Sequence, residues 1–214
     1  MNANTLSLLF FLLLSILFFL VKIHVIKYAY EKIQISPYGV FLLLFFSLLG
    51  SYVNIPLWQV PSSPHHITWF TGLWSVLPSL ITSKTTIAIN LGGAIIPIFI
   101  SLYLMVKALH PKKTLLATLI VSLIVYYFSR VVPGVGITIP ILLPAISAAL
   151  SSLLLDKQAT PQTAYISGSI GTLIGADLAN LSKIKDLGIS TASIGGAGTF
   201  DGIFLSGIMA VILA

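Results

Sequence analysis

The stretch that decides the fold is KTLLATLIVSLIVYYFSRV, residues Lys113–Val131. Charged residues stand only at its ends, as Lys113 and Arg130, and every residue between them is apolar, aromatic or hydroxyl-bearing. A run of about 20 mostly apolar residues is long enough to cross a bilayer as a helix. The stretch therefore predicts a membrane-spanning helix, and the rest of the chain can be compared with it.

The composition of the whole chain favours the same setting. Of its 214 residues 57% are hydrophobic and only 7% are charged, whereas an ordinary soluble domain carries about 25% charged residues. A water-soluble fold of this length would lack the polar residues to cover its surface. The net charge of +6 is typical of loops that face anionic lipid. No dense basic patch accompanies it, so membrane lipid and not nucleic acid is the expected partner.

Similar apolar runs lie on both sides of Lys113–Val131. We expect seven spans, near Thr5–Ile26, Tyr38–Val60, Thr85–Leu109, Lys113–Val131, Gly134–Leu155, Gln162–Leu181 and Ile194–Ala214. An eighth stretch, Ile67–Ile81, is short and rich in Trp, which leaves open whether it lies on the surface, re-enters the membrane or crosses it. Because backbone groups in lipid must pair within their own segment, each span is expected to be helical. The predicted fold class is an all-α, polytopic transmembrane helix bundle, one domain over residues 1–214, in the cell membrane.

Glycine and proline make the C-terminal half irregular. Pro140 and Pro144 fall inside one expected span and predict a kink or break. Gly171 and Gly175 form a pair of small residues four apart, which permits close helix packing. The glycine-rich stretch Gly195–Gly198 lacks the lysine of a phosphate-binding loop and is expected to be a flexible connector.

Two of the five acidic residues lie within expected spans. Asp177 and Asp201 fall one to two turns inside the same membrane face, where a carboxyl group costs on the order of 2.5–3.5 kcal/mol. Such residues persist where a function or a partner compensates. Glu31, Asp156 and Asp186 fall in expected loops, where solvated charge is the default expectation.

The residues allow several roles for the pair. Two carboxyls in contact share one proton, so one can activate water while the other protonates a carbonyl, as in aspartyl proteases. A transporter or channel with an ion- or proton-coupled site is the alternative, and a non-catalytic scaffold is a third.

The residues around the pair are expected to shape the site. We expect Gly198 and Gly202 to remove bulk around the two aspartates, and Asn54, Asn90 and Asn180 either to line the same cavity or to hydrogen-bond between helices. No metal or cofactor is expected, because His65 and His66 are adjacent in sequence and do not face one way on a helix.

One local stretch resembles a known class of enzyme. Gly198–Ser206, GTFDGIFLS, is similar to the second aspartate motif of presenilin and prepilin-peptidase type intramembrane aspartyl proteases. Phe200 stands where that motif has its second glycine, and the Pro-Ala-Leu motif of presenilins does not follow. The resemblance implies catalytic roles for Asp177 and Asp201 and a transmembrane peptide as substrate.

A second resemblance covers most of the chain. It is carried by Leu49–Pro56, Ile89–Ala94, Pro133–Ile137, Gly171–Leu178 and Ala192–Leu205. These stretches resemble an uncharacterised family of archaeal and bacterial membrane proteins, the domain-of-unknown-function family 1614. The resemblance implies a multi-pass membrane protein and assigns no activity.

Overall fold

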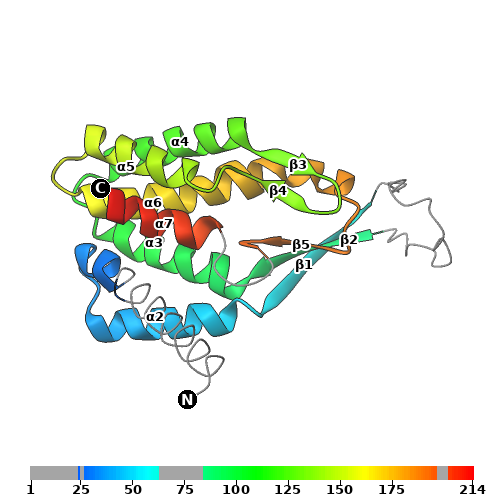
Figure 1. Cartoon of the computed structure of the whole chain (residues 1–214), viewed down its shortest axis with the longest axis horizontal. Coiled ribbons are helices and arrows are strands. Elements are labelled where there is room, and N and C mark those ends of the chain that lie inside the picture. The colour runs from blue at the N-terminus through cyan, green and yellow to red at the C-terminus, as the bar shows by residue number, and fades with distance from the viewer. Residues whose placement is uncertain (1–23, 25–26, 63–83, 197–201) are drawn as a thin grey trace, which may run out of the picture.

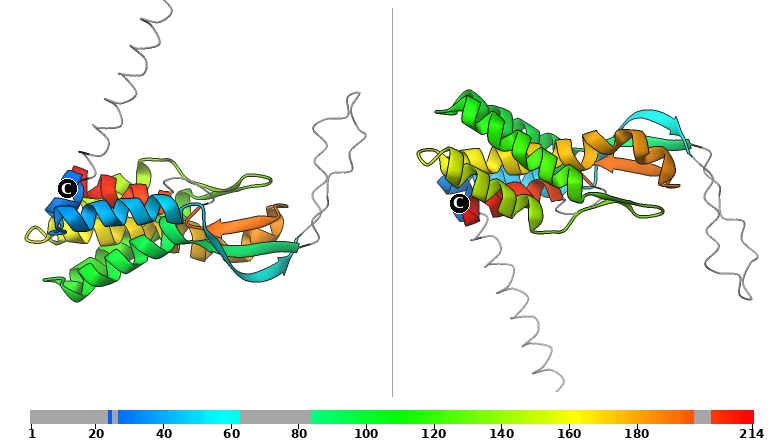
Figure 2. Two further views of the ribbon diagram at one scale, coloured as in Figure 1. Left: turned by 90° about the horizontal axis from the view of Figure 1, so that it is seen from below. Right: turned by 90° about the horizontal axis from the view of Figure 1, so that it is seen from above.

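The computed structural model describes residue 24 and residues 27–62, 84–196 and 202–214. In Figure 1 the helices lie side by side along the long axis, and the strands gather at one end. The C-terminus, the start of α2 and the loop between α5 and α6 lie together at the other end (Figures 1 and 2). The molecule therefore has a helical body, with the strands at one end and the helix-connecting turns and the C-terminus at the other.

The helical body is arranged around one central helix. The helices are α2 (Pro37–Gly50), α3 (Ile96–Val106), α4 (Pro111–Phe128), α5 (Leu143–Leu155), α6 (Thr160–Thr172) and α7 (Gly202–Leu213). α6 contacts α3, α4, α5 and α7, and nearly all its side chains are buried. Five of the helices, α2 to α6, carry a proline in the first turn. Proline starts a helix well, because the N–H it lacks would have no partner there.

Two small sheets occupy the other end. β1 (Asn54–Pro61) pairs antiparallel with β2 (Lys84–Asn90), and β2 pairs parallel with β5 (Thr191–Ile194). The second sheet is the hairpin of β3 (Arg130–Val132) and β4 (Gly136–Thr138). The helices join this end through irregular turns. β2 enters α3 by the π-helical turn η1 (Leu91–Ile95), and α6 continues into the π-helical turn η2 (Leu173–Asp177) and the 3-10 segment η3 (Leu178–Asp186).

The predicted all-α bundle of seven spans is wrong. The structure contains sheets, and within the described residues only Pro111–Phe128 is both long and apolar enough to cross a membrane. The other apolar helices, Leu91–Val106, Leu143–Leu155 and Gly202–Leu213, are shorter. A helix is not the only way to satisfy the backbone of an apolar segment, because neighbouring strands also pair its N–H and C=O groups.

The observed helices end or begin within the predicted spans where polar or helix-breaking residues interrupt the apolar runs. Lys113–Val131 is helical as predicted, over Pro111–Phe128. The run predicted over Tyr38–Val60 leaves the helix after Gly50 and becomes β1, and Thr85–Leu109 begins as β2. The predicted span Gly134–Leu155 begins in the turn before β4. The predicted span Gln162–Leu181 leaves the α-helix at Thr172, and the predicted span Ile194–Ala214 begins in β5. Thr5–Ile26, apart from residue 24, and Ile67–Ile81 lie outside the described residues.

The predicted glycine packing is confirmed. A Cβ on Gly171 would lie 2.7 Å from Val121 Cγ1, and one on Gly175 would lie 2.4 Å from the carbonyl oxygen of Ser122. These two glycines let α6 and η2 approach the backbone of α4 where larger residues would clash. The close approach fixes where Asp177, at the end of η2, lies relative to the rest of the body.

Candidate functional site

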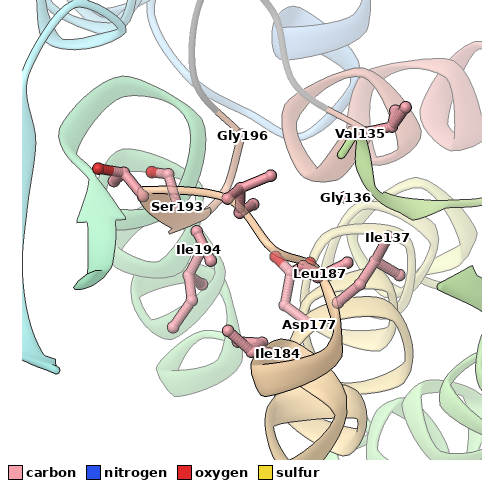
Figure 3. Close-up of a pocket in the computed structure, with 12 residues that line it drawn as sticks. Val135, Gly136, Ile137, Asp177, Ile184, Leu187, Ser193, Ile194 and Gly196 are labelled. Carbon is pink, nitrogen blue, oxygen red and sulfur yellow. The ribbon is translucent and has the colours of Figure 1, made fainter. Parts of the chain in front are cut away.

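Asp177 lines a cavity between the two sheets. It is the last residue of η2 and is half-buried, and the cavity has a volume of about 170 Å³. The cavity wall combines the β3–β4 hairpin, the segment η3 and the strand β5, through Val135, Ile137, Ile184 and Ser193 among others. Figure 3 shows the Asp177 side chain rising from its helical turn toward the chain that leaves β5. A carboxyl group is thus set among mostly apolar neighbours.

The backbone after β5 is shaped to meet this carboxylate. The backbone N–H of Gly195 donates to Asp177 Oδ2 at 3.0 Å. Gly195 and Gly196 have φ angles of +80° and +76°, which glycine adopts readily and other residues rarely do. A Cβ on Gly195 would also lie 2.5 Å from the Cβ of Ala94 in η1. A glycine is therefore required at position 195 both by its backbone conformation and by the lack of space.

Asn180 supports the break in the helix that presents Asp177. Its side chain is fully buried, and its Nδ2 lies 2.9 Å from the carbonyl oxygen of Ala176 and 3.2 Å from that of Gly175. Lys183 Nζ donates to its Oδ1 at 2.8 Å. A π-helical turn followed by a 3-10 segment leaves carbonyls without their usual partners. Asn180 supplies those partners directly beside the candidate catalytic residue.

Asn54 and Asn90 lie together, and neither lines the cavity. Asn90 Nδ2 donates to Asn54 Oδ1 at 3.0 Å and to the carbonyl oxygen of Ser51 at 2.8 Å. Ser193 Oγ donates to Asn54 Oδ1 at 2.6 Å. In Figure 3 the Ser193 side chain points away from Asp177. These bonds link β1, β2 and β5. The described contacts of both asparagines are with the protein itself and hold the sheet together.

The remaining predicted site residues lie at the edge of the described chain or outside it. Asp201 and Gly198 are outside the described residues. Gly202 is the first residue of α7, and a Cβ there would meet only Ile139 Cδ1, at 3.9 Å. Of the predicted site residues, the structure therefore places Asp177 in a cavity wall and Asn180 next to its helical turn.

A second polar site lies at the other end of the body. His110 Nδ1 lies 2.9 Å from Asp156 Oδ1, and Thr163 Oγ1 donates to Asp156 Oδ2 at 3.0 Å. Because a carboxylate can only accept, His110 donates from Nδ1. Asp156 is fully buried, so the expectation that it is a solvated loop charge is wrong. The sequence signal was weak, since the nearest hint is the hydroxyl pair Thr160 and Thr163 just after Asp156.

The fold and the site define a class of protein with an apolar helical body and, at one end, a small sheet and a cavity lined by a half-buried carboxylate. The chain belongs to the family described as "Protein of unknown function (DUF1614)", whose model matches residues 48–213. No curated protein and no solved structure matches the chain.

Proposed function

We propose that this protein hydrolyses peptide bonds with an aspartate pair, Asp177 and Asp201. The observation that carries the proposal is the position of Asp177, in the wall of a cavity beside the edge strand β5. The sheet order β1-β2-β5 leaves β5 at an edge of the sheet within the described chain. An exposed sheet edge binds an extended peptide through main-chain hydrogen bonds.

The cavity supports the binding of such a peptide next to the carboxylate. It lies between β5 on one side and residues 135–137 of the hairpin on the other. A peptide added alongside β5 would pass Asp177, while the apolar residues Ile137 and Ile184 would accommodate its side chains. The resemblance of Gly198–Ser206 to the presenilin type motif supports a role for Asp201 as the second acid.

The chemistry assigned to the pair is general acid and base catalysis. One carboxylate accepts a proton from water, which attacks the peptide carbonyl carbon, while the other, protonated, donates its proton to the carbonyl oxygen. The tetrahedral product then collapses, the C–N bond breaks, and the leaving amine takes up a proton. The backbone N–H of Gly195 donates to Asp177 Oδ2 and orients this carboxyl group beside the cavity, which suits the base.

The test uses the purified full chain and a mixture of apolar peptides, with the products identified by mass spectrometry. The wild-type protein should cleave, and Asp177→Asn and Asp201→Asn should each lower the rate at least about 100-fold, the usual contribution of one acid or base. Asp186→Asn is the matched control, because Asp186 does not line the cavity. Equal activity of the wild type and Asp177→Asn would reject the proposal.

Ion- or proton-coupled transport remains the alternative, favoured by the two π-helical turns η1 and η2 that interrupt the helical body near Asp177. Broken helices with nearby carboxylates form ion sites in many transporters. The same purified variants separate the two functions. Transport requires that Na⁺, K⁺ or pH shifts the unfolding temperature of the wild type but not of Asp177→Asn, without any cleavage.

We also infer that the helical body contacts the acyl chains of a cell membrane. The exposed faces of α3, α4 and α5 carry large apolar side chains, hereafter the apolar belt, which comprises Phe99, Leu102, Val106, Leu115, Leu116, Leu119, Leu123, Ile146, Leu150 and Leu154. None of the six helices α2 to α7 has a charged residue except Lys112 and Lys113 at the start of α4. Large exposed apolar side chains gathered on a helical surface mark contact with a membrane or with another protein.

A further inference from the structure

One end of the molecule is strongly positive. The chain segments that meet there are the helical residues 27–32, the turn from α3 to α4 and the turn from α5 to α6 (Figures 1 and 2). They carry six lysines, hereafter the basic end, namely Lys27, Lys32, Lys107, Lys112, Lys113 and Lys157. All are exposed except Lys32, which is half-buried.

The acidic residues at this end neutralise little of that charge. Glu31 lies 3.7 Å from Lys27 as an exposed pair, and such pairs leave most of the field in place. Asp156 is fully buried and bonded to His110 and Thr163. The surface at this end therefore presents lysine ammonium groups to its surroundings, and Glu31 is the one exposed side-chain carboxylate there within the described residues.

Long-range contacts fix the lysine-bearing segments to one another. The His110–Asp156 bond ties the α3–α4 turn to the α5–α6 turn across 46 positions of sequence. Lys32 Nζ donates to the carbonyl oxygen of Val211, at the end of α7, at 3.4 Å. The lysines thus come from separate parts of the chain and are brought together by the fold. The basic end is therefore a property of the folded surface and not of one basic loop.

Apolar side chains directly adjoin the lysines. Val106 precedes Lys107 and is 89% exposed, and Leu154 lies three residues before Lys157 and is 78% exposed. Lys107 Nζ also lies 4.2 Å from the ring centre of Tyr103, which is itself exposed. An aromatic and lysine border next to an apolar belt is typical of the level at which lipid headgroups lie.

We propose that the basic end binds the headgroups of anionic phospholipids while the apolar belt contacts their acyl chains. Clusters of four to eight lysines beside an apolar helix attract anionic lipid, each lysine strengthening binding by about fivefold. The opposite end bears Lys84, Arg130, Lys183 and Lys185 together with Asp177 and Asp186. Because its charges are more balanced and lie on the sheets and η3, we assign the anionic lipid to the basic end alone.

The test measures binding of fluorescent phosphatidylglycerol to the detergent-purified full chain by fluorescence anisotropy. Replacing three exposed lysines in K112Q/K113Q/K157Q should raise the Kd by about 100-fold. The matched control K84Q/R130Q/K185Q removes the same charge from the other end and should change the Kd by less than about fivefold. Circular dichroism establishes that both variants remain folded, which is expected because all six replaced side chains are exposed.

Three results would overturn the proposal. Equal weakening by the two triple variants would show a nonspecific charge effect. Displacement by phosphatidylcholine as effective as that by phosphatidylglycerol would show that headgroup charge is not recognised. Displacement by inorganic phosphate at the same concentrations would assign the lysines to a free anion and not to lipid.

Discussion

The burial of Asp156 is a property of one residue that the sequence around it does not show. Hydropathy places it in a polar turn, and its partner His110 is 46 positions away, so no local pattern reports the contact. Its burial is explained only by bonds that the fold creates: His110 and Thr163 donate to its carboxylate, and Thr160 Oγ1 donates to its backbone carbonyl. A buried carboxylate persists only when it is paired and hydrogen-bonded in this way.

Removing that carboxylate should destabilise the fold. Asp156→Ala leaves His110 and Thr163 without their acceptor, and removing one partner of a buried hydrogen bond costs about 1–3 kcal/mol. Asp156→Asn keeps the shape and one acceptor oxygen, so it should cost less. Chemical denaturation of the purified protein measures both. Asp186→Asn, in η3, should stay within about 0.5 kcal/mol, and an equally small effect of Asp156→Ala would contradict the role of the pair.

Asn180 is another single residue on which the site depends, because its side-chain amide supports the turn that carries Asp177. Asn180→Ala should lower the free energy of unfolding by about 1–3 kcal/mol, because the carbonyls of Gly175 and Ala176 lose a buried donor. Ser182→Ala tests an exposed position of the same segment and should be nearly neutral. Thermal unfolding followed by circular dichroism provides the comparison. If the two variants unfold at the same temperature, Asn180 does not support the break.

At the scale of elements, the glycine spacing was read correctly from the sequence. Gly171 and Gly175 predicted close packing, and α4 lies against both. Gly175→Ala should cost about 1–3 kcal/mol, because the added methyl group would meet backbone atoms of Ser122 and Tyr126 that cannot rotate away. Gly202→Ala is the control, since its added Cβ would meet only Ile139 Cδ1, at an ordinary contact distance of 3.9 Å. Denaturation midpoints of the two variants should differ clearly, and similar midpoints would refute tight packing at Gly175.

The sequence predicted α4 but not the strands, and the reason is physical. An uninterrupted apolar run such as Pro111–Phe128 has no residue that stops a helix before its end. The apolar residues Ile87–Ile89 of β2 are followed, after Asn90, by the apolar residues of η1 and α3, so hydropathy alone does not show where the strand ends and the helix begins. Their partners in β1 and β5 lie about 30 and 105 positions away in the sequence. Pairing over such separations depends on the whole fold.

The candidate site was predictable only in part for the same reason. An acid within an apolar run indicates a candidate functional residue, and on this ground the sequence selects Asp177 and Asp201. The cavity that surrounds Asp177 could not be read in this way, because it is assembled from the β3–β4 hairpin, η3 and β5. Likewise, the asparagines were visible as polar breaks, but whether they face a cavity or hold strands together depends on their partners in space.

At the scale of the whole molecule, substitutions in the apolar belt should have different effects depending on whether the belt faces water or lipid. Leu119 and Leu123 lie one turn apart near the middle of α4, and they are 56% and 60% exposed. In water, replacing exposed residues changes stability by less than about 0.5 kcal/mol, whereas a lysine at the centre of a membrane costs about 2.5–3.5 kcal/mol. Leu119→Lys and Leu123→Lys should therefore reduce the protein that stays in the membrane fraction after an alkaline wash. Val135→Lys, 70% exposed on the hairpin turn, should not, because it lies beyond the apolar belt. Full retention of both leucine variants would mean that this face of α4 does not contact lipid.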